Sequence, residues 1–565
     1  MGKQKIVIIG GVACGPKAAS RIKRLDPEAE VTILEKGKLI SYAGCGLPFY
    51  LSGQISDYHD LINTPTGAIR DPAFFKAVKD VTVLNKTIAE KVDRRQKIVM
   101  ARQLETDEIL KFPYDNLVMA VGATPFVPPM EGVSLKGVYS LTTIDDARQI
   151  RDNQGPLKGK KAVIIGGGLI GIEAAEAFAR QGMTITIIEK LETVLAALID
   201  PEIAYHVQNE LQNQGIRLML GDGVTRINGD SNGKVTGVTT QNDELEADFV
   251  LVAIGSRPNV SLAREMGLEL GVTGAIKVDS RLQTSDPAIY AGGDCVENIN
   301  LVTNKPIYTP MGSTANKHGR VIADNICGIN SIFKGVAGTG ICKVFDINVA
   351  RTGLSEVAAR REGYDIITVL TPSPDKPHFQ SDAKLIIIKL IVDKPTRKLL
   401  GAQVVGPGDV AKRIDAAVLT ISHGLAVDEM SNADLAYAPP FSPAMDNIIV
   451  AANIAQNKLN GIGKFITPGE VKAKMDNKED FILLDLRSPE EYKQMRIEDS
   501  RIRLIPLGKL REKTAELPRD KEIICFCKIS LRGYEAERIL KAEGFENVKI
   551  MDGGIICWPY DKFVQ

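Results

Sequence analysis

One pattern occurs twice in this chain and constrains its fold more than any other feature: an apolar run, a glycine-rich turn and a helical segment. In the second copy, residues 161–190, Gly166, Gly168 and Gly171 follow a β-rich run, and a further apolar run ends at Glu189. Glycines at this spacing let the backbone approach a pyrophosphate at a helix N-terminus, and the acid binds ribose hydroxyls. The segment predicts a dinucleotide-binding βαβ unit.

The first copy of the pattern lies at residues 5–36. A strand is expected over 5–9, Gly10, Gly11 and Gly15 form the turn, and the next apolar run carries Glu35. Val12 stands where the middle glycine usually lies, so this copy is less regular. Two nucleotide sites, the second inserted in the first, predict electron transfer from a nicotinamide cofactor to a flavin.

Further segments complete these two predicted sites. MAVGATP (119–125) and IYAGGDC (289–295) each read as a strand that ends in a glycine turn, and VAIGSRPN (252–259) returns the chain to the first domain. Glu189 should repel a 2′-phosphate, which favours NADH over NADPH, although Lys190 beside it weakens that preference.

Length and composition limit the class of protein. A chain of 565 residues is too long for one core and predicts three or four domains. Lys plus Arg and Asp plus Glu both number 70, so charge gives no reason to expect nucleic acid or membrane as a partner. Cys525 and Cys527 are the only closely spaced pair among eight cysteines, which predicts no metal site and no disulfide framework. The N-terminal apolar run is too short for a signal peptide, so we expect a cytoplasmic protein.

The segment SYAGCGLPFY (41–50) holds a single cysteine, Cys45. A redox pair would need a second cysteine four or five residues away, but positions 40 and 50 are Ile and Tyr. If Cys45 acts beside a flavin, its sulfur partner must therefore come from outside the chain, as a small thiol, a persulfide or a peroxide-derived sulfenate.

With GGVACG, SYAGCGLPFY, GGGLIGIE and GGDC in this order, residues 1 to about 455 resemble the coenzyme A-disulfide reductase branch of the pyridine nucleotide-disulfide reductases. This branch includes NADH-dependent persulfide reductases and some NADH oxidases. The resemblance implies bound FAD, NADH and coenzyme A (CoA), with Cys45 on the flavin face and Asp294 on the flavin ribityl chain. The predicted cofactor-binding residues are Gly10, Gly11, Val12, Ala13, Glu35, Lys36, Ala120, Gly122, Asp294, Ala315, Phe441, Gly166, Gly168, Leu169, Ile170, Gly171, Glu189, Lys190 and Gly255.

The helix expected over residues 16–25 presents Lys17, Arg21 and Arg24 on one face. Spacing alone fits a solvated basic face equally well. The resemblance implies that these side chains grip the CoA phosphates and that Ser41 holds the pantetheine end. Gly44 replaces an Asn that is frequent in this branch, which puts one CoA contact in doubt. The NADH peroxidases and oxidases usually carry a His at the position of Ala13, which argues against specialised oxygen chemistry.

Residues from about 330 to 450 read as strands of an antiparallel sheet with one helix and resemble the dimerisation domain of the same enzymes. In those enzymes the segment matching LAYAPPFSP reaches the partner subunit's flavin and substrate. The resemblance implies a homodimer in which Tyr437 donates a proton and Phe441 packs near the isoalloxazine. The alternative for Tyr437 is an interface hydroxyl. Phe379 stands where a second tyrosine is usual.

The last hundred residues carry a second cysteine motif. Residues 481–492 and 521–540 each read as a buried strand, a loop and a helix, and Cys527 and Arg532 bracket the second loop. Backbone amides of such a loop stabilise an anionic sulfur. With Asp552-Gly553-Gly554 and Trp558, this part resembles a rhodanese, which implies a persulfide at Cys527. A docking module is the alternative, because the usual Gly-His-Ile-x-Gly-Ala segment is missing and Ser530 replaces a glycine. Cys525 is expected in the core.

These observations predict an α/β protein: two Rossmann-like three-layer domains for FAD and NAD, an α+β dimerisation domain and a rhodanese-like α/β domain. The predicted function is NADH-dependent reduction of CoA persulfide or polysulfide at Cys45, with sulfane sulfur delivered by Cys527. CoA-disulfide reduction, an NADH oxidase with a Cys45 sulfenate, and a redox-sensing scaffold are the alternatives. The predicted boundaries are 1–115 with 250–328 for FAD, 116–249 for NAD, 329–455 for dimerisation, 456–466 for a linker and 467–565 for the rhodanese-like domain.

Overall fold

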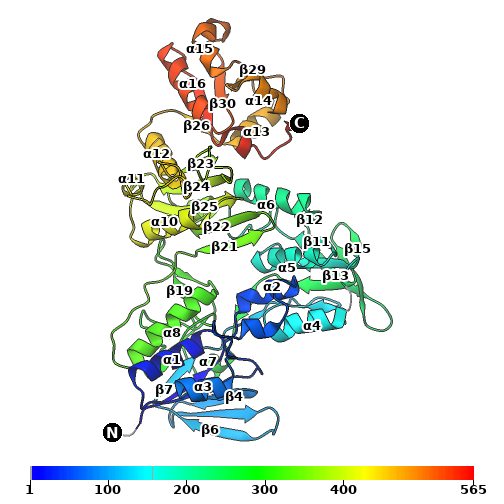
Figure 1. Ribbon diagram of the computed structural model, residues 1–565, viewed down its shortest axis with the longest axis vertical. Helices are drawn as coiled ribbons and strands as arrows, with labels where there is room; N and C mark the ends of the chain where they lie inside the picture. Colours follow the sequence, from blue (N-terminus) through cyan, green and yellow to red (C-terminus); the bar gives the residue numbers. More distant parts are fainter. Residues whose placement is uncertain (1–2, 155–156) are drawn as a thin grey trace. The chain divides into compact units, whose positions relative to one another are not determined.

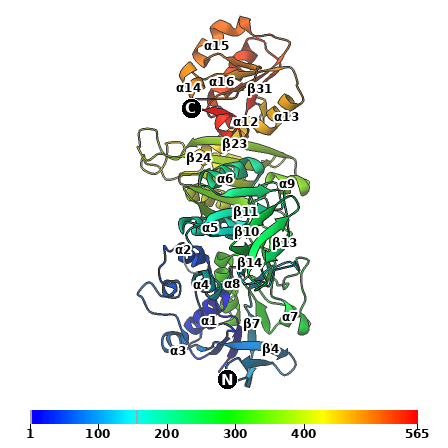
Figure 2. The same cartoon turned by 90° about the vertical axis from the view of Figure 1, so that its right-hand side faces the viewer.

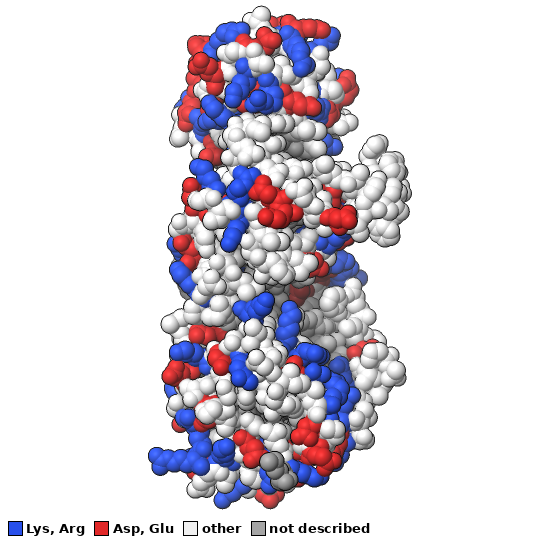
Figure 3. Space-filling view, turned by 90° about the vertical axis from the view of Figure 1, so that its left-hand side faces the viewer, with Lys and Arg blue, Asp and Glu red and all other residues white. Residues whose placement is uncertain are grey.

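The structure is a computed structural model that describes residues 3–154 and 157–565. The chain forms two compact units, one of residues 1–192 with 215–336 and the other of residues 193–214 with 337–565. Lys and Arg are interspersed with Asp and Glu on the face shown in Figure 3. No helix within the described ranges is long and apolar enough to cross a membrane.

The first unit contains a five-stranded parallel sheet in the order β18-β7-β1-β2-β3. Its strand β7 is labelled in Figure 1. Ile6 and Ile8 of β1 pack on the side of α1 and α8, whereas Val7 and Ile9 pack on the opposite side, as the alternation of a strand requires. An antiparallel meander, β4-β5-β6, supplies part of that opposite layer. The elements are β1 (Lys5–Ile9), α1 (Cys14–Leu25), β2 (Glu30–Leu34), α2 (Leu47–Leu51), α3 (Pro72–Lys79), β3 (Thr82–Leu84), β4 (Thr87–Asp93), β5 (Ile98–Gln103), β6 (Ile109–Pro113), β7 (Asn116–Met119), α7 (Ser261–Glu265), β18 (Ile289–Ala291), β19 (Asn298–Ile299), β20 (Pro306–Ile307) and α8 (Gly312–Ile326).

A second parallel sheet, in the order β12-β11-β10-β16-β9, repeats this plan. Val163 and Ile165 of β10 pack against the antiparallel strands β13 and β14, through Ile227 and Val238. The elements are β9 (Val138–Tyr139), α4 (Ile144–Gln154), β10 (Lys161–Ile165), α5 (Leu169–Arg180), β11 (Thr184–Glu189), β12 (Arg217–Leu220), β13 (Val224–Gly229), β14 (Val235–Thr240), β15 (Glu244–Glu246) and β16 (Phe249–Val252).

The chain crosses between these two sheets through a pair of short antiparallel strands, β8 (Ala123–Pro125) and β17 (Ser256–Pro258). Strand β7 pairs with β1 and β18, so residues 116–119 lie in the first sheet. The predicted boundary at 116 assigns these residues to the NAD-binding domain, which contains the second sheet. Strand β16 lies in the second sheet and spans the other predicted boundary, at 249/250. In both cases the chain leaves a sheet only after the carboxyl end of a complete strand.

The second unit contains an antiparallel sheet in the order β21-β22-β25-β24-β23, which confirms the sheet expected in this region. Helices α6 and α9 are tied to it by Lys389, a buried side chain whose Nζ lies 2.8 Å from both Glu202 and Glu356 and 3.1 Å from Asp200. Three carboxylates offset the loss of hydration of this cation. The elements are α6 (Pro201–Asn213), β21 (Gly340–Val344), β22 (Ile347–Gly353), α9 (Glu356–Arg361), β23 (Ile366–Pro374), β24 (Leu385–Asp393), β25 (Leu399–Gly406), α10 (Ala411–Ser422), α11 (Val427–Ser431) and α12 (Asn447–Leu459).

The second unit also contains a five-stranded parallel sheet in the order β26-β31-β30-β27-β29. Figure 2 labels its strand β31 and the helices α13 to α16. Leu510 of α15 and Leu540 of α16 pack on one face, and Val471 of α13 and Trp558 pack on the other. The elements are β26 (Phe465–Ile466), α13 (Pro468–Asp476), β27 (Phe481–Asp485), α14 (Pro489–Gln494), β28 (Met495–Arg496), β29 (Ile502–Leu504), α15 (Leu507–Lys513), β30 (Glu522–Phe526), α16 (Leu531–Ala542), β31 (Val548–Met551) and β32 (Phe563–Val564).

The linker predicted over 456–466 is shorter in the structure. Helix α12 continues through Leu459, and β26 already begins at Phe465. The irregular segment between α12 and β26 contains Gly461 and Gly463, which both have positive φ. The polar residues that suggested a loose segment are anchored instead: Gln456 donates to Asp428, and Lys458 is almost fully buried.

Candidate active site and sulfur-transfer loop

The backbone of the first glycine turn packs closely against the end of β7. Gly10 has φ +111°, and an added Cβ would lie 2.1 Å from the carbonyl oxygen of Ala120 at the end of β7. The Gly11 and Gly37 amides each donate to one carboxylate oxygen of Glu35, at 2.7 Å. Helix α1 starts just after this turn without a side-chain cap, so its first amides are available to an anion.

Asp294 gives an independent sign that a ligand belongs here. Its Oδ1 is buried and has no hydrogen-bond partner among the described residues, and burial raises the pKa of its carboxyl group. A buried acceptor left unpaired is costly, which fits a ligand hydroxyl as its missing donor. Ala315 lies beside the same turn, where a Cβ on Gly293 would lie 3.7 Å from its Cβ.

The second glycine turn has the same construction. Gly166 has φ +110°, and an added Cβ would lie 2.5 Å from the carbonyl oxygen of Ala253. Glu189 accepts from the Gly167 amide at 2.7 Å and from the Leu191 amide at 2.9 Å. Helix α5 begins at Leu169, also without a side-chain cap. Both turns therefore pair a close backbone approach with an oriented acid, and their residues fit two dinucleotides.

Cys45 lies in a single helical turn, Gly44–Gly46, ahead of α2. All eight cysteines are free, and Cys45 is exposed. Protein atoms around its sulfur nevertheless raise its pKa, and the carboxylates of Glu173 and Asp294 raise it further. The pKa of Glu173 is itself raised to about 7, first by burial and then by Glu176. Cys45 is thus an exposed thiol without a disulfide partner, so its oxidation needs a reactant from outside the chain.

We expect Glu173→Gln to make Cys45 more reactive. Above the pKa of Glu173 its carboxylate disfavours the Cys45 thiolate, so removing that charge lowers the thiol pKa and raises the thiolate fraction. Alkylation of the Cys45 peptide by iodoacetamide at pH 8 should be about twofold faster, after allowance for the weaker nucleophilicity of a less basic thiolate. Glu265→Gln, an exposed carboxylate on α7, is the matched control. An unchanged rate in Glu173→Gln would contradict this coupling.

The helix α1 side chains predicted to grip CoA do not share one environment. Lys17 and Arg24 are exposed, whereas Arg21 donates through Nε to the buried carboxylate of Asp324 on α8, at 2.8 Å. Ser41 has φ +51°, and its amide donates to the Gly11 carbonyl at 2.7 Å. An added Cβ on Gly44 would meet nothing within 4 Å, so a larger residue would fit in this chain.

In the second unit, the segment between α11 and α12 presents large apolar side chains to solvent. Tyr437 is 54% exposed and Phe441 is 68% exposed, and Phe379 elsewhere in the unit is 66% exposed. The segment is nevertheless fixed at its end, because the fully buried Arg413 pairs with Asp446 at 2.9 Å. Exposed aromatic side chains on an ordered segment are typical of an interface with another molecule.

Cys527 follows the carboxyl end of β30 and is 1% exposed. Arg532, in the first turn of α16, contacts the Cys527 sulfur and also donates from both terminal nitrogens to Glu491, each at 2.7 Å. This pair lowers the pKa of Glu491 to about 2. Ser530 has φ +78°, a conformation that favours glycine, and its hydroxyl donates to the Met551 carbonyl at 2.7 Å. Cys525 lies in the core, as predicted.

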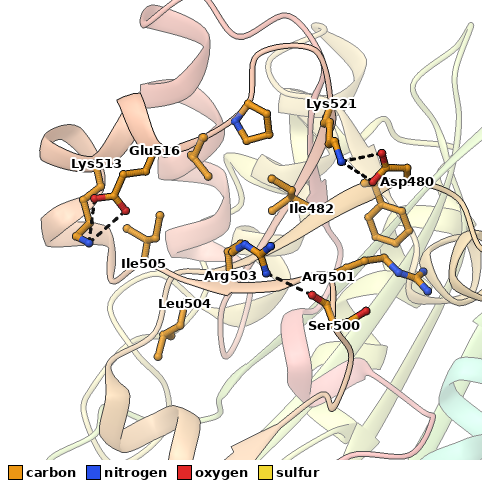
Figure 4. Close-up of a pocket in the computed structure, with 13 residues that line it drawn as sticks. Asp480, Ile482, Ser500, Arg501, Arg503, Leu504, Ile505, Lys513, Glu516 and Lys521 are labelled. Carbon is orange, nitrogen blue, oxygen red and sulfur yellow. Dashed lines mark hydrogen bonds and ion pairs between the residues drawn. The ribbon is translucent and has the colours of Figure 1, made fainter.

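A cavity of about 550 Å³ lies at the other end of this sheet (Figure 4). Its walls come from the starts of β27 and β30 and from β29, so it is not part of the Cys527 loop. Its charged side chains largely pair with each other: Lys521 with Asp480 at 2.7 Å and Lys513 with Glu516 at 3.2 Å. We assign it no role in sulfur chemistry.

Comparison with known proteins defines the class. The family described as pyridine nucleotide-disulphide oxidoreductase matches residues 4–305, its dimerisation domain matches 339–449, and a rhodanese-like domain matches 467–559. The chain therefore belongs to the pyridine nucleotide-disulphide oxidoreductase family and carries a rhodanese-like domain. The resemblance and the α/β fold class inferred from the motifs are confirmed.

Three relatives narrow the comparison. The solved NAD-dependent persulfide reductase from A. fulgidus is 44% identical with a TM-score of 0.93, over 98% of this chain and 100% of that one. Bacillus anthracis CoADR-RHD is 34% identical with a TM-score of 0.92, over 99% and 98% of the two chains. The NAD(P)H coenzyme A polysulfide/persulfide reductase of Pyrococcus horikoshii is 38% identical over 80% of this chain and 98% of its own length.

Sequence reasoning missed three side chains that interact with predicted site residues, Glu173 through its charge and the other two through hydrogen bonds. Glu173 and Asp324 lie far in sequence from Cys45 and Arg21, so no local pattern marks them. Glu491 had a signal: with Ser488 it forms a capping box at the start of α14, and this spacing can be seen in the sequence. The pattern did not show that the same carboxylate also holds Arg532.

Proposed function

We propose that this protein uses NADH to reduce the sulfane sulfur of CoA persulfide or polysulfide at Cys45. The Cys45 thiolate attacks the outer sulfur of CoA–S–SH, releases the CoA thiolate and becomes a persulfide. Two electrons then cleave the S–S bond of this persulfide, which returns Cys45 to the thiolate and releases the outer sulfur with its proton as hydrosulfide. Cys527 supplies the substrate: it takes sulfane sulfur from a donor, and a CoA thiolate removes the outer sulfur to form CoA–S–SH.

The observation that carries this proposal is a single redox cysteine combined with a sulfur-transfer loop in one chain. Cys45 is exposed and has no cysteine partner, so it is suited to an external sulfur substrate. A rhodanese-like loop has no role in reducing a symmetric disulfide, but it can load CoA with sulfur. The A. fulgidus relative, which aligns with nearly the whole chain, is named a persulfide reductase, and the Pyrococcus horikoshii relative, which aligns with the reductase part, is named a polysulfide/persulfide reductase.

The residues of the two glycine turns would hold FAD through Gly10, Glu35 and Asp294 and NADH through Gly166 and Glu189. Flavin, when bound, supplies the two-electron chemistry between the nicotinamide and the sulfur. Lys17, Arg21 and Arg24 would bind the CoA phosphates, with Asp324 orienting Arg21.

We also propose a homodimer. Its support is the match to a dimerisation domain and the exposed aromatic segment of the second unit. In this dimer Tyr437 of the partner subunit would donate a proton to the leaving thiolate. We place the protein in the cytoplasm, because eight free cysteines suit a reducing compartment.

Glu189→Ala should weaken the preference for NADH. A charged hydrogen bond to the ribose is worth about 1.5–3 kcal/mol, so kcat/KM for NADH should fall about 10- to 100-fold. The value for NADPH should rise, because the carboxylate that repels its 2′-phosphate is gone. Steady-state kinetics with both cofactors measure the ratio, with flavin content as a check on folding. Glu192→Ala, an exposed neighbour, is the control. An unchanged ratio would mean that Glu189 does not select the cofactor.

The function is tested by anaerobic NADH oxidation with CoA persulfide and CoA disulfide on one enzyme preparation. We expect faster turnover of the persulfide, with one sulfide released per NADH. A preference for the disulfide would overturn the proposal in favour of CoA-disulfide reduction. Oxygen-dependent NADH consumption that exceeds both would instead indicate an oxidase.

A further inference from the structure

Helix α12, which packs on β23 and β24 of the antiparallel sheet, carries in its last turn a lysine, Lys458, that reaches the rhodanese-like domain. Lys458 Nζ donates to the carboxylate of Asp552 and to the Thr368 carbonyl, the latter at 2.7 Å. The two side chains of the pair are only 9% and 5% exposed. The ammonium also lies 4.5 Å from the centre of the Phe465 ring. This is a desolvated contact, unlike the surface ion pairs that contribute little.

Asp552 begins the turn that supports the Cys527 loop. Its amide donates to the Ile466 carbonyl at 3.0 Å, and the turn continues through Gly553 and Gly554, both with positive φ. An added Cβ on Gly554 would lie 2.4 Å from the Cys527 carbonyl oxygen. Ile555, one residue later, donates its amide to that same oxygen at 2.9 Å. The carboxylate held by Lys458 therefore lies within three residues of the backbone contact with Cys527.

The same turn touches the antiparallel sheet directly. A Cβ on Gly553 would lie 3.4 Å from Leu370 Cδ2 on β23. Removal of the lysine charge would leave the buried Asp552 carboxylate without its ion-pair partner, and the negative charge of Glu470 also disfavours its ionisation. An unpaired buried carboxylate must be neutralised or move towards water, and either change displaces the turn.

We infer that Lys458 is a positioning residue for sulfur transfer: by holding Asp552 it fixes the turn beneath Cys527, so that the dimerisation domain sets the geometry of the rhodanese-like loop. This inference rests on the proposed role of Cys527 as sulfur carrier. The step that it supports is attack of the CoA thiolate on the outer sulfur of the Cys527 persulfide, which forms CoA–S–SH and returns the Cys527 thiolate. Reduction at Cys45 does not involve Lys458.

The test compares Lys458→Met and Lys458→Arg in the full-length holoenzyme by anaerobic NADH oxidation. One assay supplies preformed CoA persulfide and the other supplies polysulfide with catalytic CoA. Lys458→Met should lower kcat with polysulfide about tenfold and leave turnover of CoA persulfide within about twofold, and Lys458→Arg should recover most of the loss. Lys472→Met, which breaks a more exposed ion pair with Asp476 on α13 of the rhodanese-like domain, is the matched control.

A second readout follows the loop itself. Cys527 is buried in the folded protein, so alkylation of its peptide by iodoacetamide should rise several-fold in Lys458→Met and stay unchanged in Lys472→Met. If Lys458→Met lowers turnover equally in both assays, or lowers it in neither, the inference is wrong. If Lys458→Met does not fold, Asp552→Asn gives the same two readouts. Cys527→Ser distinguishes the carrier role of Cys527 from the positioning role of Lys458. If Cys527→Ser does not selectively lower turnover of polysulfide, the carrier role is wrong. If Cys527→Ser lowers it selectively and Lys458→Met does not, only the inference about Lys458 is wrong.

Discussion

Cys45→Ser is expected to lower persulfide reduction by at least about a thousandfold, with the flavin still bound. A serine hydroxyl is scarcely ionised at neutral pH and cannot hold a sulfane sulfur, so the persulfide adduct cannot form. The exposed side chain of Cys45 sits in a short turn, and the loss of one sulfur atom there leaves both glycine turns intact. Anaerobic NADH oxidation and sulfide release with CoA persulfide measure the effect.

Cys327→Ser is the matched control for this prediction, because Cys327 is the other cysteine of the first unit that is not buried. It should retain full turnover. Sulfide release by Cys45→Ser within about tenfold of the unmodified protein would mean that the substrate is reduced without a covalent adduct on Cys45. The single-cysteine mechanism would then be wrong even though the family assignment stands.

The parts that could be predicted from the sequence are those whose geometry is local. The strand expected at 5–9 is β1, and the helix expected at 16–25 is α1, which begins two residues earlier at Cys14. A glycine turn followed by an acid-bearing strand needs only neighbouring residues, so the placement of Glu35 and Glu189 beside their turns follows from spacing.

The parts that could not be predicted depend on distant packing. Spacing places Arg21 with Lys17 and Arg24 on one basic face, and the family resemblance implies that it binds the CoA phosphates. Neither indicates that its Nε donates to Asp324, which lies 303 residues away. Residues 456–466 were expected as a linker because they are polar and contain glycine, yet Lys458 is buried against Asp552. Composition reports which side chains prefer water, but only the fold decides whether a charged group finds a partner that permits burial.

Cys527→Ser should separate the two halves of the proposed mechanism. Turnover of polysulfide with catalytic CoA should fall about a hundredfold, because serine cannot carry sulfur, whereas turnover of preformed CoA persulfide should stay within about twofold. Both rates come from anaerobic NADH oxidation on the same preparation.

Cys525→Ala provides the structural control for Cys527→Ser. Cys525 lies two residues earlier on β30, is fully buried and packs in the same core, so its truncation costs about 1 kcal/mol of domain stability without touching the loop chemistry. If it lowers polysulfide turnover as much as Cys527→Ser, the loss reflects domain stability and not sulfur transfer. If Cys527→Ser lowers the turnover of both substrates equally, the rhodanese-like domain stabilises the reductase and does not supply it with CoA persulfide. Sulfane sulfur must then reach CoA by another route.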